Sequence, residues 1–254
     1  LTDSLIKDGL WDVYNQFHMG NAGELCAARY RFSRQEVDDF ALESYSRARE
    51  AITAGSFTRE IVPVEVPQKK GAPRIVTDDE EPNRVDLSGL RQLKPVFQDD
   101  GVLTVGNSPS CNDGAAALVV MAEEEAHRLG LLPMARIVGY AGAALAPEWF
   151  TIAPIEAIRR LLKQTGLVVS DIDLFEINEA FSVVSLAINR ELGLDAKKVN
   201  VNGGAVALGH PIGATGARIL TTLLHAMEAR DARRGLASLC IGGGEALALI
   251  VERT

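Results

Sequence analysis

The sequence has few of the residues that build metal centres, disulfide frameworks or membrane spans. Its three cysteines form no CxxC pair, and its four histidines form no HExxH or similar cluster, so we expect no metal site. A sparse, odd set of cysteines suits a reducing compartment better than a disulfide scaffold. No apolar run approaches the roughly 18–20 residues that a membrane helix needs. We therefore expect a cytoplasmic protein with no membrane partner.

Nucleotide-binding and nucleic-acid-binding signals are also missing. No Walker loop and no GxGxxG spacing occurs, and 26 Lys+Arg against 34 Asp+Glu give a net charge of -8, which argues against a nucleic-acid partner. The hydrophobic fraction of 47% instead predicts a globular, core-forming chain. The first residues, LTDSLIKDGLW, hold neither an initiator methionine nor a signal-peptide core, so we expect an incomplete chain.

Residues 1–100 have an irregular pattern with one clear helix. Ser33-Arg34-Gln35-Glu36 has capping-box spacing, and apolar residues follow it at helical intervals up to Gly55. Residues 60–66 (EIVPVEV) predict a strand that Pro63 confines to a sheet edge. Residues 68–84 predict a solvated loop or hairpin.

From residue 102 onward, strands and helices alternate, which predicts an α/β layered domain with a mixed sheet and covering helices. The apolar runs predict buried strands, and the helices follow from apolar periodicity with proline at the start and glycine at the end. We expect strands at 115–121, 135–141, 173–177, 236–241 and 246–252, and helices at 123–129, 154–165, 178–192 and 217–230.

Three segments carry more polar and glycine residues than packing requires, and each lies at the carboxyl end of a strand, where α/β sheets build sites. Taken alone, Asn178 is a helix cap and Cys240 a small buried hydrophobe. The Gly242–Gly244 turn, however, leaves N–H groups that can face developing negative charge. His210 lies in the glycine-rich stretch Gly203–Gly216, where the backbone can approach a ligand closely. Together these groups indicate carbonyl chemistry on a thioester or acyl group.

The same segments resemble motifs of the thiolase family. They read NEAF at 178–181, NxxGGAxALGHPxGATG at 200–216 and CIGGG at 240–244. Six further segments follow in thiolase order and spacing: HMG at 18–20, SRQEVDDFALESYSRA at 33–48, EIVPV at 60–64, LKPVF at 93–97, GNSPSCNDGAAA at 106–117 and ARIVGYA at 135–141. The resemblance covers essentially the whole chain and implies a thiolase-like α/β fold with a mixed five-stranded sheet covered by helices.

The resemblance implies an acyl-CoA acyltransferase of fatty-acid metabolism and β-oxidation. Such an enzyme condenses two acetyl-CoA molecules reversibly, or cleaves a 3-ketoacyl-CoA with coenzyme A. Cys240 resembles the family's acid/base thiol, for which an ordinary pKa near ~8.5 is suitable. His210 resembles the histidine that supports the nucleophile and donates to the thioester oxygen. Asn178 would hold a water in that oxyanion site, and the N–H of Gly242 would form half of a second oxyanion site.

The resemblance also implies coenzyme A as a substrate, no resident cofactor, and a homodimer or homotetramer. Pro109 stands where the family often has a serine that meets the pantetheine, and Ser108 is a neighbour that could replace it. For Phe97 and Phe181, core packing explains the residue type as well as ligand contact does. The family's CoA contacts carry over to Leu10, His18, Met19, Phe97, Ser108, Ala180 and Phe181.

The family's nucleophilic cysteine is the missing part of this pattern. It lies in the N-terminal half of a thiolase, and neither Cys26, which we expect to pack in a helix, nor Cys111 stands in its motif. We therefore expect a C-terminal portion that lacks the N-terminal nucleophile half and is inactive alone. A non-catalytic CoA-binding fragment and an inert fragment kept soluble by association are the alternatives. The expected divisions are 1–105 (loop domain), 106–132 (last strand and helix of the N-terminal domain) and 133–254 (C-terminal domain).

Overall fold

A mixed four-stranded sheet forms the centre of the second half of the chain. The computed structural model describes residues 1–254 without a gap. Only β7 and β6 run parallel; β5–β8 and β8–β7 are antiparallel pairs. The predicted α/β class with a mixed sheet is confirmed. In spatial order the strands are β5 (Ala135–Ala144), β8 (Glu245–Arg253), β7 (Arg234–Ile241) and β6 (Leu174–Ile177).

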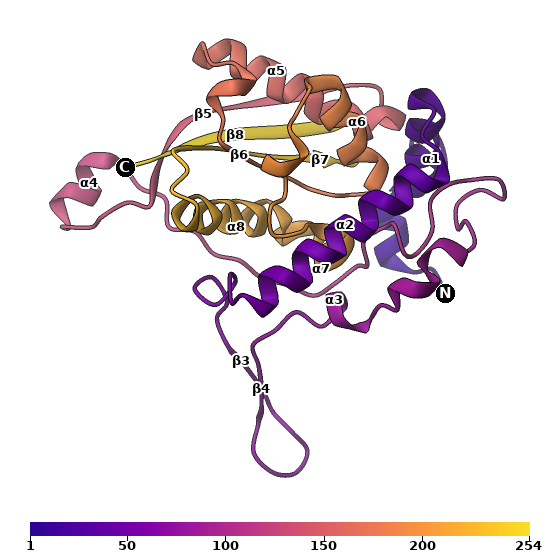
Figure 1. The fold of residues 1–254 in the computed structure, drawn as a ribbon, viewed down its shortest axis with the longest axis horizontal. Helices are drawn as coiled ribbons and strands as arrows, with labels where there is room; N and C mark the ends of the chain where they lie inside the picture. Colours follow the sequence, from indigo (N-terminus) through magenta and orange to yellow (C-terminus); the bar gives the residue numbers. More distant parts are fainter.

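Helices cover both faces of this sheet (Figure 1). The helices α5 (Ala153–Thr165) and α6 (Ser182–Leu192) lie on one face, over the larger of the apolar cores. The helix α8 (Thr215–Ala229) lies on the opposite face, against β6 and β7. Side chains of β8 alternate between the two cores, as the two-residue period of a strand requires: Ala246, Ala248 and Ile250 face the α5 side, and Leu249 and Val251 the α8 side.

The signals at the ends of α5 act as predicted. A proline stands in its first turn, and Gly166 ends the helix in the left-handed conformation at φ 70°. The apolar residues Ile155, Ile158 and Leu161 are all buried on the side that faces the sheet. The sequence pattern therefore fixed this helix and its orientation correctly.

The first half of the chain contributes two long helices. The predicted capping box of α2 (Arg34–Thr53) is present, because Ser33 Oγ accepts from the Glu36 N–H and the Glu36 carboxylate accepts from the Ser33 N–H. The helix α1 (Met19–Tyr30) was expected only around Cys26, without bounds, since Gly20 and Gly23 lower its helix propensity. Cys26 is buried on α1, as expected of a helical packing position.

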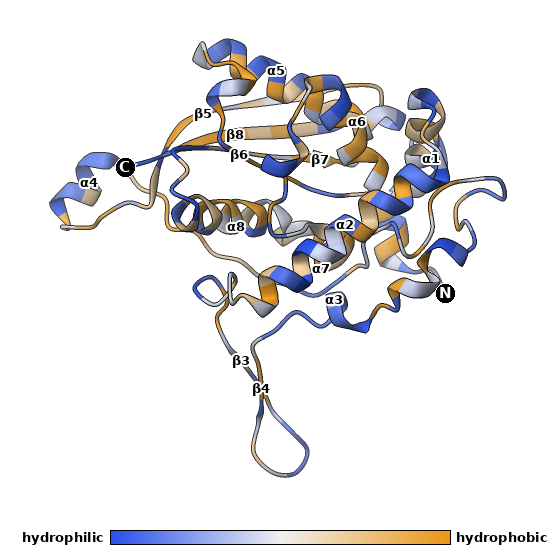
Figure 2. Ribbon diagram, viewed as in Figure 1, coloured by the Kyte–Doolittle hydropathy of each residue, from blue (hydrophilic) through white to orange (hydrophobic).

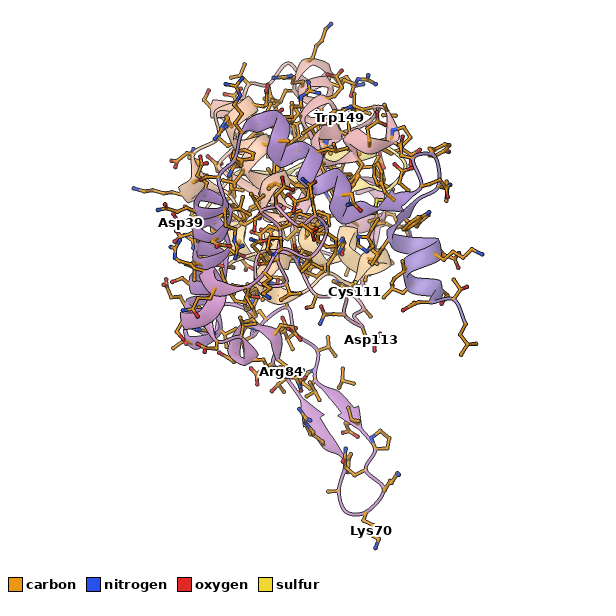
Figure 3. All side chains as sticks on the ribbon, turned by 90° about the vertical axis from the view of Figure 1, so that its right-hand side faces the viewer. Asp39, Lys70, Arg84, Cys111, Asp113 and Trp149 are labelled. Carbon is orange, nitrogen blue, oxygen red and sulfur yellow. The ribbon has the colours of Figure 1, made fainter.

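A β-hairpin projects from the body of the molecule (Figures 1 and 3). Its strands β3 (Val64–Val66) and β4 (Arg74–Val76) pair antiparallel, and Lys70 lies at the far end of the loop between them (Figure 3). The predicted strand at 60–66 is thus three residues long and begins after Pro63. A smaller hairpin joins β1 (Trp11–Asp12) to β2 (Phe17–His18).

Short helices complete the chain. Three are α-helical: α3 (Glu81–Arg84), α4 (Glu123–Arg128) and α7 (Ala205–Leu208). One is a π-helical turn, Leu5–Leu10, and the 3-10 turns are Leu87–Gln92, Pro147–Ile152, Val169–Asp171, Ala196–Lys198 and Ile212–Ala214.

Two predicted elements are wrong. Residues 115–121 form no strand, and the central sheet has four strands where five were expected. Val119 and Val120 are 87% and 71% exposed, because no strand of this chain lies beside them to pair with or cover them. The helix expected from residue 178 begins only at Ser182, since Asn178 and Glu179 are held by side-chain contacts of the site described below.

The distribution of hydropathy follows the layers. Figure 2 shows hydrophobic colour along β5 and β8, and hydrophilic colour over most of α3 and α4. No helix combines the length and the apolar character that a membrane crossing requires.

Candidate functional site

Asn178 and Cys240 lie at the same edge of the sheet. Asn178 directly follows β6, and Cys240 lies near the end of β7; these two strands are parallel, and their carboxyl ends meet there. The Asn178 N–H donates to the carbonyl of Ser238 at 2.9 Å, two residues before Cys240 along β7. The strand pairing therefore brings together two residues that are 62 positions apart in the sequence.

His210 completes a hydrogen-bonded chain of three side chains. Its Nε2 lies 3.3 Å from Asn178 Nδ2, and its Nδ1 lies 2.7 Å from Thr215 Oγ1, at the start of α8. The Asn178 amide nitrogen can only donate, so Nε2 accepts this bond, and the ring proton on Nδ1 is donated to the Thr215 hydroxyl. The ring is thus held at both nitrogens. Asn178 and Thr215 are buried, and the imidazole is half-buried.

The imidazole of His210 is neutral at physiological pH. Burial is the largest cause, and the positive charge of Arg218 adds to it; together they lower the pKa of His210 from 6.5 to about 4. A neutral ring with its proton on Nε2 can donate a hydrogen bond to a carbonyl oxygen without carrying a charge into the buried site. The site is thus suited to hydrogen-bond stabilisation of an oxyanion.

The Cys240 thiol is half-buried and packs against the main apolar core. Burial raises its pKa to about 12, which is well above the ordinary value on which the predicted acid/base role was based. The thiol is therefore protonated at physiological pH, and it is a weaker acid than an ordinary cysteine. It can act as a base only if a substrate or neighbouring group stabilises the thiolate.

The turn after Cys240 has the conformation that its glycines predict. Gly243 and Gly244 both have φ 99°, in the left-handed region that side chains disfavour. A Cβ on Gly242 would lie 2.6 Å from Met19 Cε, so a side chain there requires the Met19 methyl group to move. The Gly242 N–H donates to no backbone carbonyl, which leaves it free to face a ligand.

Four of the predicted CoA-contact residues form one cluster. The rings of His18 and Phe97 stack at 4.9 Å, and Phe181 meets Phe97 edge-on at 5.9 Å. Met19 follows His18 and extends to the turn at Gly242, which connects the cluster to the candidate catalytic residues. Phe181 is buried and Phe97 half-buried, so core packing also accounts for their contacts.

The other predicted CoA contacts are less clearly placed. Leu10 is half-buried against the main core, and Ala180 is buried beside the candidate oxyanion residue. Ser108 is buried, and its hydroxyl has no hydrogen-bond partner. Cys111 is exposed on the surface (Figure 3), and its backbone pairs with that of His210.

The sequence reasoning missed two residues that hold this site. Thr215 fixes the His210 ring, and Glu179 binds three groups around the glycine-rich segment. Both stand inside the motifs already quoted, so their position beside the assigned residues was the available signal. No group of three or more acidic, cysteine or histidine side chains is placed to hold a metal ion.

Two glycines of the glycine-rich segment approach protein, not ligand. A Cβ on Gly203, which has φ 81°, would lie 2.7 Å from the Ser44 carbonyl on α2. A Cβ on Gly204 would lie 2.2 Å from Glu179 Cδ. The expectation that these glycines open a path for a ligand is therefore wrong at this pair.

The sheet, its helical layers and the amide–imidazole–thiol grouping define a layered α/β protein whose candidate site suits acyl chemistry. The family model "Thiolase, N-terminal domain" matches residues 1–124, and "Thiolase, C-terminal domain" matches residues 131–253. The chain therefore belongs to the thiolase family.

Relatives and solved structures agree with this assignment. An acetyl-CoA acetyltransferase of Pseudomonas aeruginosa is 51% identical over 100% of this chain and 65% of its own length. The crystal structure of the Bacillus anthracis acetyl-CoA acetyltransferase matches 99% of this chain and 64% of its own, with 43% identity and a TM-score of 0.96. The Acat5 thiolase from Ascaris suum, solved in complex with coenzyme A, matches 100% of this chain and 65% of its own, with 44% identity and a TM-score of 0.94.

One prediction about the extent of the chain needs correction. The chain was expected to lack the N-terminal half of a thiolase, but the N-terminal domain model matches its first 124 residues. The family model includes in the N-terminal domain the residues that were assigned to a separate loop domain. The chain spans about 65% of the length of the relatives it matches. The division at residue 105 stays a prediction.

Proposed function

We propose that the protein is an acyl-CoA acyltransferase that condenses two acetyl-CoA molecules or cleaves a 3-ketoacyl-CoA with coenzyme A. The observation that carries this proposal is the Asn178–His210–Thr215 hydrogen-bonded chain beside the Cys240 strand end. The relatives named acetyl-CoA acetyltransferase support it.

The neutral imidazole of His210 and the amide of Asn178 form the first oxyanion site. For the ring to donate to a substrate oxygen, the Thr215 hydroxyl donates to Nδ1 and the ring proton lies on Nε2. The Asn178 carbonyl oxygen is buried without a partner in the protein, so it can hold a water. A thioester oxygen placed there gains hydrogen bonds that strengthen as negative charge develops.

Cys240 and the Gly242 N–H serve the second half of the reaction. In condensation, Cys240 acts as its thiolate and takes an α-proton from acetyl-CoA. The resulting carbanion attacks the acyl carbon of the acyl-enzyme, and the thioester bond breaks to release the nucleophilic cysteine as a thiolate. In thiolysis the same sulfur returns the proton to the departing acetyl-CoA. The Gly242 N–H faces the oxygen of the tetrahedral intermediate, where a preorganised donor is most effective.

Coenzyme A enters as a substrate, and we propose no resident cofactor. The stacked pair His18–Phe97, together with Phe181, forms an apolar wall that leads by Met19 to Gly242. The Ser108 hydroxyl and the Leu10 and Ala180 side chains complete this wall in the proposal. The complex of the Acat5 thiolase with coenzyme A supports the assignment of the ligand class.

The 254-residue chain alone is proposed to be inactive in acyl transfer. None of its three thiols is activated: burial raises the pKa of Cys26 and Cys240 to about 12, and it also raises the pKa of Cys111. A nucleophilic cysteine instead needs a lowered pKa. This observation also favours the second candidate function, a CoA-binding fragment without catalysis.

Two measurements test these proposals. Calorimetric titration of the chain with coenzyme A is expected to show binding, and no binding would refute both candidate functions. An acetoacetyl-CoA thiolysis assay on the chain is expected to show no turnover, whereas the whole protein is expected to be active. In the whole protein, His210→Ala and Cys240→Ser should each abolish thiolysis while Cys111→Ser retains it. Turnover near wild type in Cys240→Ser would refute the acid/base assignment.

The wider setting of the enzyme is also a proposal. We propose a cytoplasmic homodimer or homotetramer that acts in fatty-acid metabolism, including β-oxidation. Sedimentation of the whole protein tests the assembly, and a monodisperse monomer would contradict it.

A further inference from the structure

Glu179 is a buried carboxylate without a role in the chemistry above. Glu179 is 1% exposed, and its carboxylate accepts three hydrogen bonds. The donors are Ser44 Oγ on α2 at 2.7 Å, Asn200 Nδ2 at 2.9 Å and the Val206 N–H of α7 at 3.0 Å. Three segments far apart in the sequence therefore meet at one carboxylate.

The first connection leads from Glu179 to His210. Ser44 Oγ also accepts from the Gly204 N–H at 3.1 Å, so the Gly204 and Val206 amides are both tied to the carboxylate, one through the hydroxyl and one directly. These two amides start the short helix α7, and the Gly209 N–H closes its last turn onto the Ala205 carbonyl at 2.8 Å. His210 follows immediately, so the position of its backbone depends on how α7 is seated.

The second connection leads from Glu179 to Asn178. Asn200 pairs with the end of β6 through both of its amide atoms: Oδ1 accepts from the Ile177 N–H, and Nδ2 donates to the Ile177 carbonyl, both at 2.8 Å. Asn200 itself has φ 46°, a left-handed conformation that asparagine tolerates better than most residues. The bond from Asn200 to Glu179 thus fixes the strand end that carries Asn178.

We propose that Glu179 is a positioning residue that sets the separation of the Asn178 amide and the His210 imidazole. The two side chains lie 3.3 Å apart and reach the site along different segments, β6 and α7, and the Glu179 carboxylate is the group that binds both segments. What the pair does to a substrate rests on the proposed acyltransferase function; the positioning itself does not.

A buried carboxylate can also stabilise a protein with no effect on a site, so a matched control is needed. Glu24 provides one. It is 6% exposed, lies on α1, and accepts from the Val102 and Leu103 N–H groups at 3.0 and 2.8 Å. Glu24→Gln therefore removes a buried carboxylate that binds backbone amides, at a place with no connection to α7.

The test is a side-chain NMR titration of the chain, which has only four histidines. The His210 signal is assigned by its loss in His210→Asn. In Glu179→Gln, an NH2 group replaces one carboxylate oxygen and faces protein groups that are themselves hydrogen-bond donors. The lost hydrogen bonds loosen α7, and His210 gains access to water. The pKa of His210 is then expected to rise from about 4 toward 6.5. Ser44→Ala removes the bond to Glu179 and the link to Gly204 but leaves the Glu179 bonds to Asn200 and Val206 in place, so it is expected to give a smaller rise.

Each outcome decides the question. A rise in Glu179→Gln or Ser44→Ala, with no change in Glu24→Gln at similar loss of thermal stability, supports positioning. An unchanged His210 titration in both variants overturns it and leaves Glu179 a stabilising group only. If Glu179→Gln does not fold, Ser44→Ala decides alone.

The outcome is separable from that of the proposed function. In the active whole protein, Glu179→Gln is expected to lower kcat by about 100-fold with KM little changed, because a displacement of about 1 Å has that effect on a preorganised site. A wild-type protein without thiolysis would refute the acyltransferase proposal, while the NMR result would still stand for or against positioning.

Discussion

The close approach of Gly204 to Glu179 yields a prediction whose magnitude follows from the structure. Gly204 has φ -139° and ψ -163°, a conformation open to any residue, so alanine there carries no backbone strain. Its Cβ, however, would lie 2.2 Å from Glu179 Cδ and 2.4 Å from one carboxylate oxygen, where ordinary contacts begin at 3.4 Å. Either α7 or the carboxylate must move by about 1 Å.

The cost has two parts. Overpacking of a filled interior costs about 1–3 kcal/mol. Moving the carboxylate also weakens its bonds to Ser44, Asn200 and Val206, and each hydrogen bond to a charged group contributes about 1.5–3 kcal/mol. With one such bond lost, Gly204→Ala is expected to lower the free energy of unfolding by about 2.5–6 kcal/mol, a large part of the ~5–15 kcal/mol of a typical domain.

Urea titration followed by circular dichroism measures this change. Gly216→Ala is the matched control, because a Cβ on Gly216 meets nothing within 4 Å and the residue lies in α8. It is expected to stabilise the protein by up to about 1 kcal/mol through helix propensity. The double variant with Glu179→Asp, which shortens the carboxylate by one methylene, should recover part of the loss. A Gly204→Ala protein within about 1 kcal/mol of wild type would refute the close-packing argument.

Three further predictions concern other parts of the chain. Burial raises the pKa of Glu60 to about 7, above its ordinary 4.5, so its contribution to stability is complete below about pH 4.5 and is lost as the pH rises through 7. In urea titrations, Glu60→Gln should reduce the fall in the free energy of unfolding over this pH range. Iodoacetamide at neutral pH, followed by peptide mass spectrometry, should label exposed Cys111 well before Cys240, and equal rates would contradict the burial of Cys240. Ser33→Ala should cost about 1 kcal/mol in the same titrations, since it removes the cap of α2, and no loss would show that α2 does not depend on its capping box.

Periodic segments of the sequence predicted the fold well. The helix from Pro154 to Gly166 and the strands that became β7 and β8 carry patterns that only one packing satisfies, because one face must be buried. The prediction failed where local composition does not decide the outcome. The apolar run at 115–121 has the composition of a buried strand, but pairing needs a neighbour that composition cannot show.

The residues of the candidate site could be predicted from the sequence, but their pKa values and supporting contacts could not. Asn178, His210 and Cys240 stood out because amide, imidazole and thiol groups at strand ends indicate chemistry. The pKa values of His210 and Cys240 could not be foreseen, because burial sets both and burial depends on the packed structure.

The glycine-rich segment shows why these contacts cannot be predicted from the sequence. A glycine that lets a ligand approach and a glycine that lets a carboxylate approach have the same letter. Gly203 and Gly204 face α2 and Glu179, whereas Gly242 leaves its N–H without a backbone partner beside Met19. The first pair seats the segment that carries His210, and the second position is the proposed donor to substrate. Substitution at Gly204 is therefore expected to act through stability and His210 position, and substitution at Gly242 through the reaction itself.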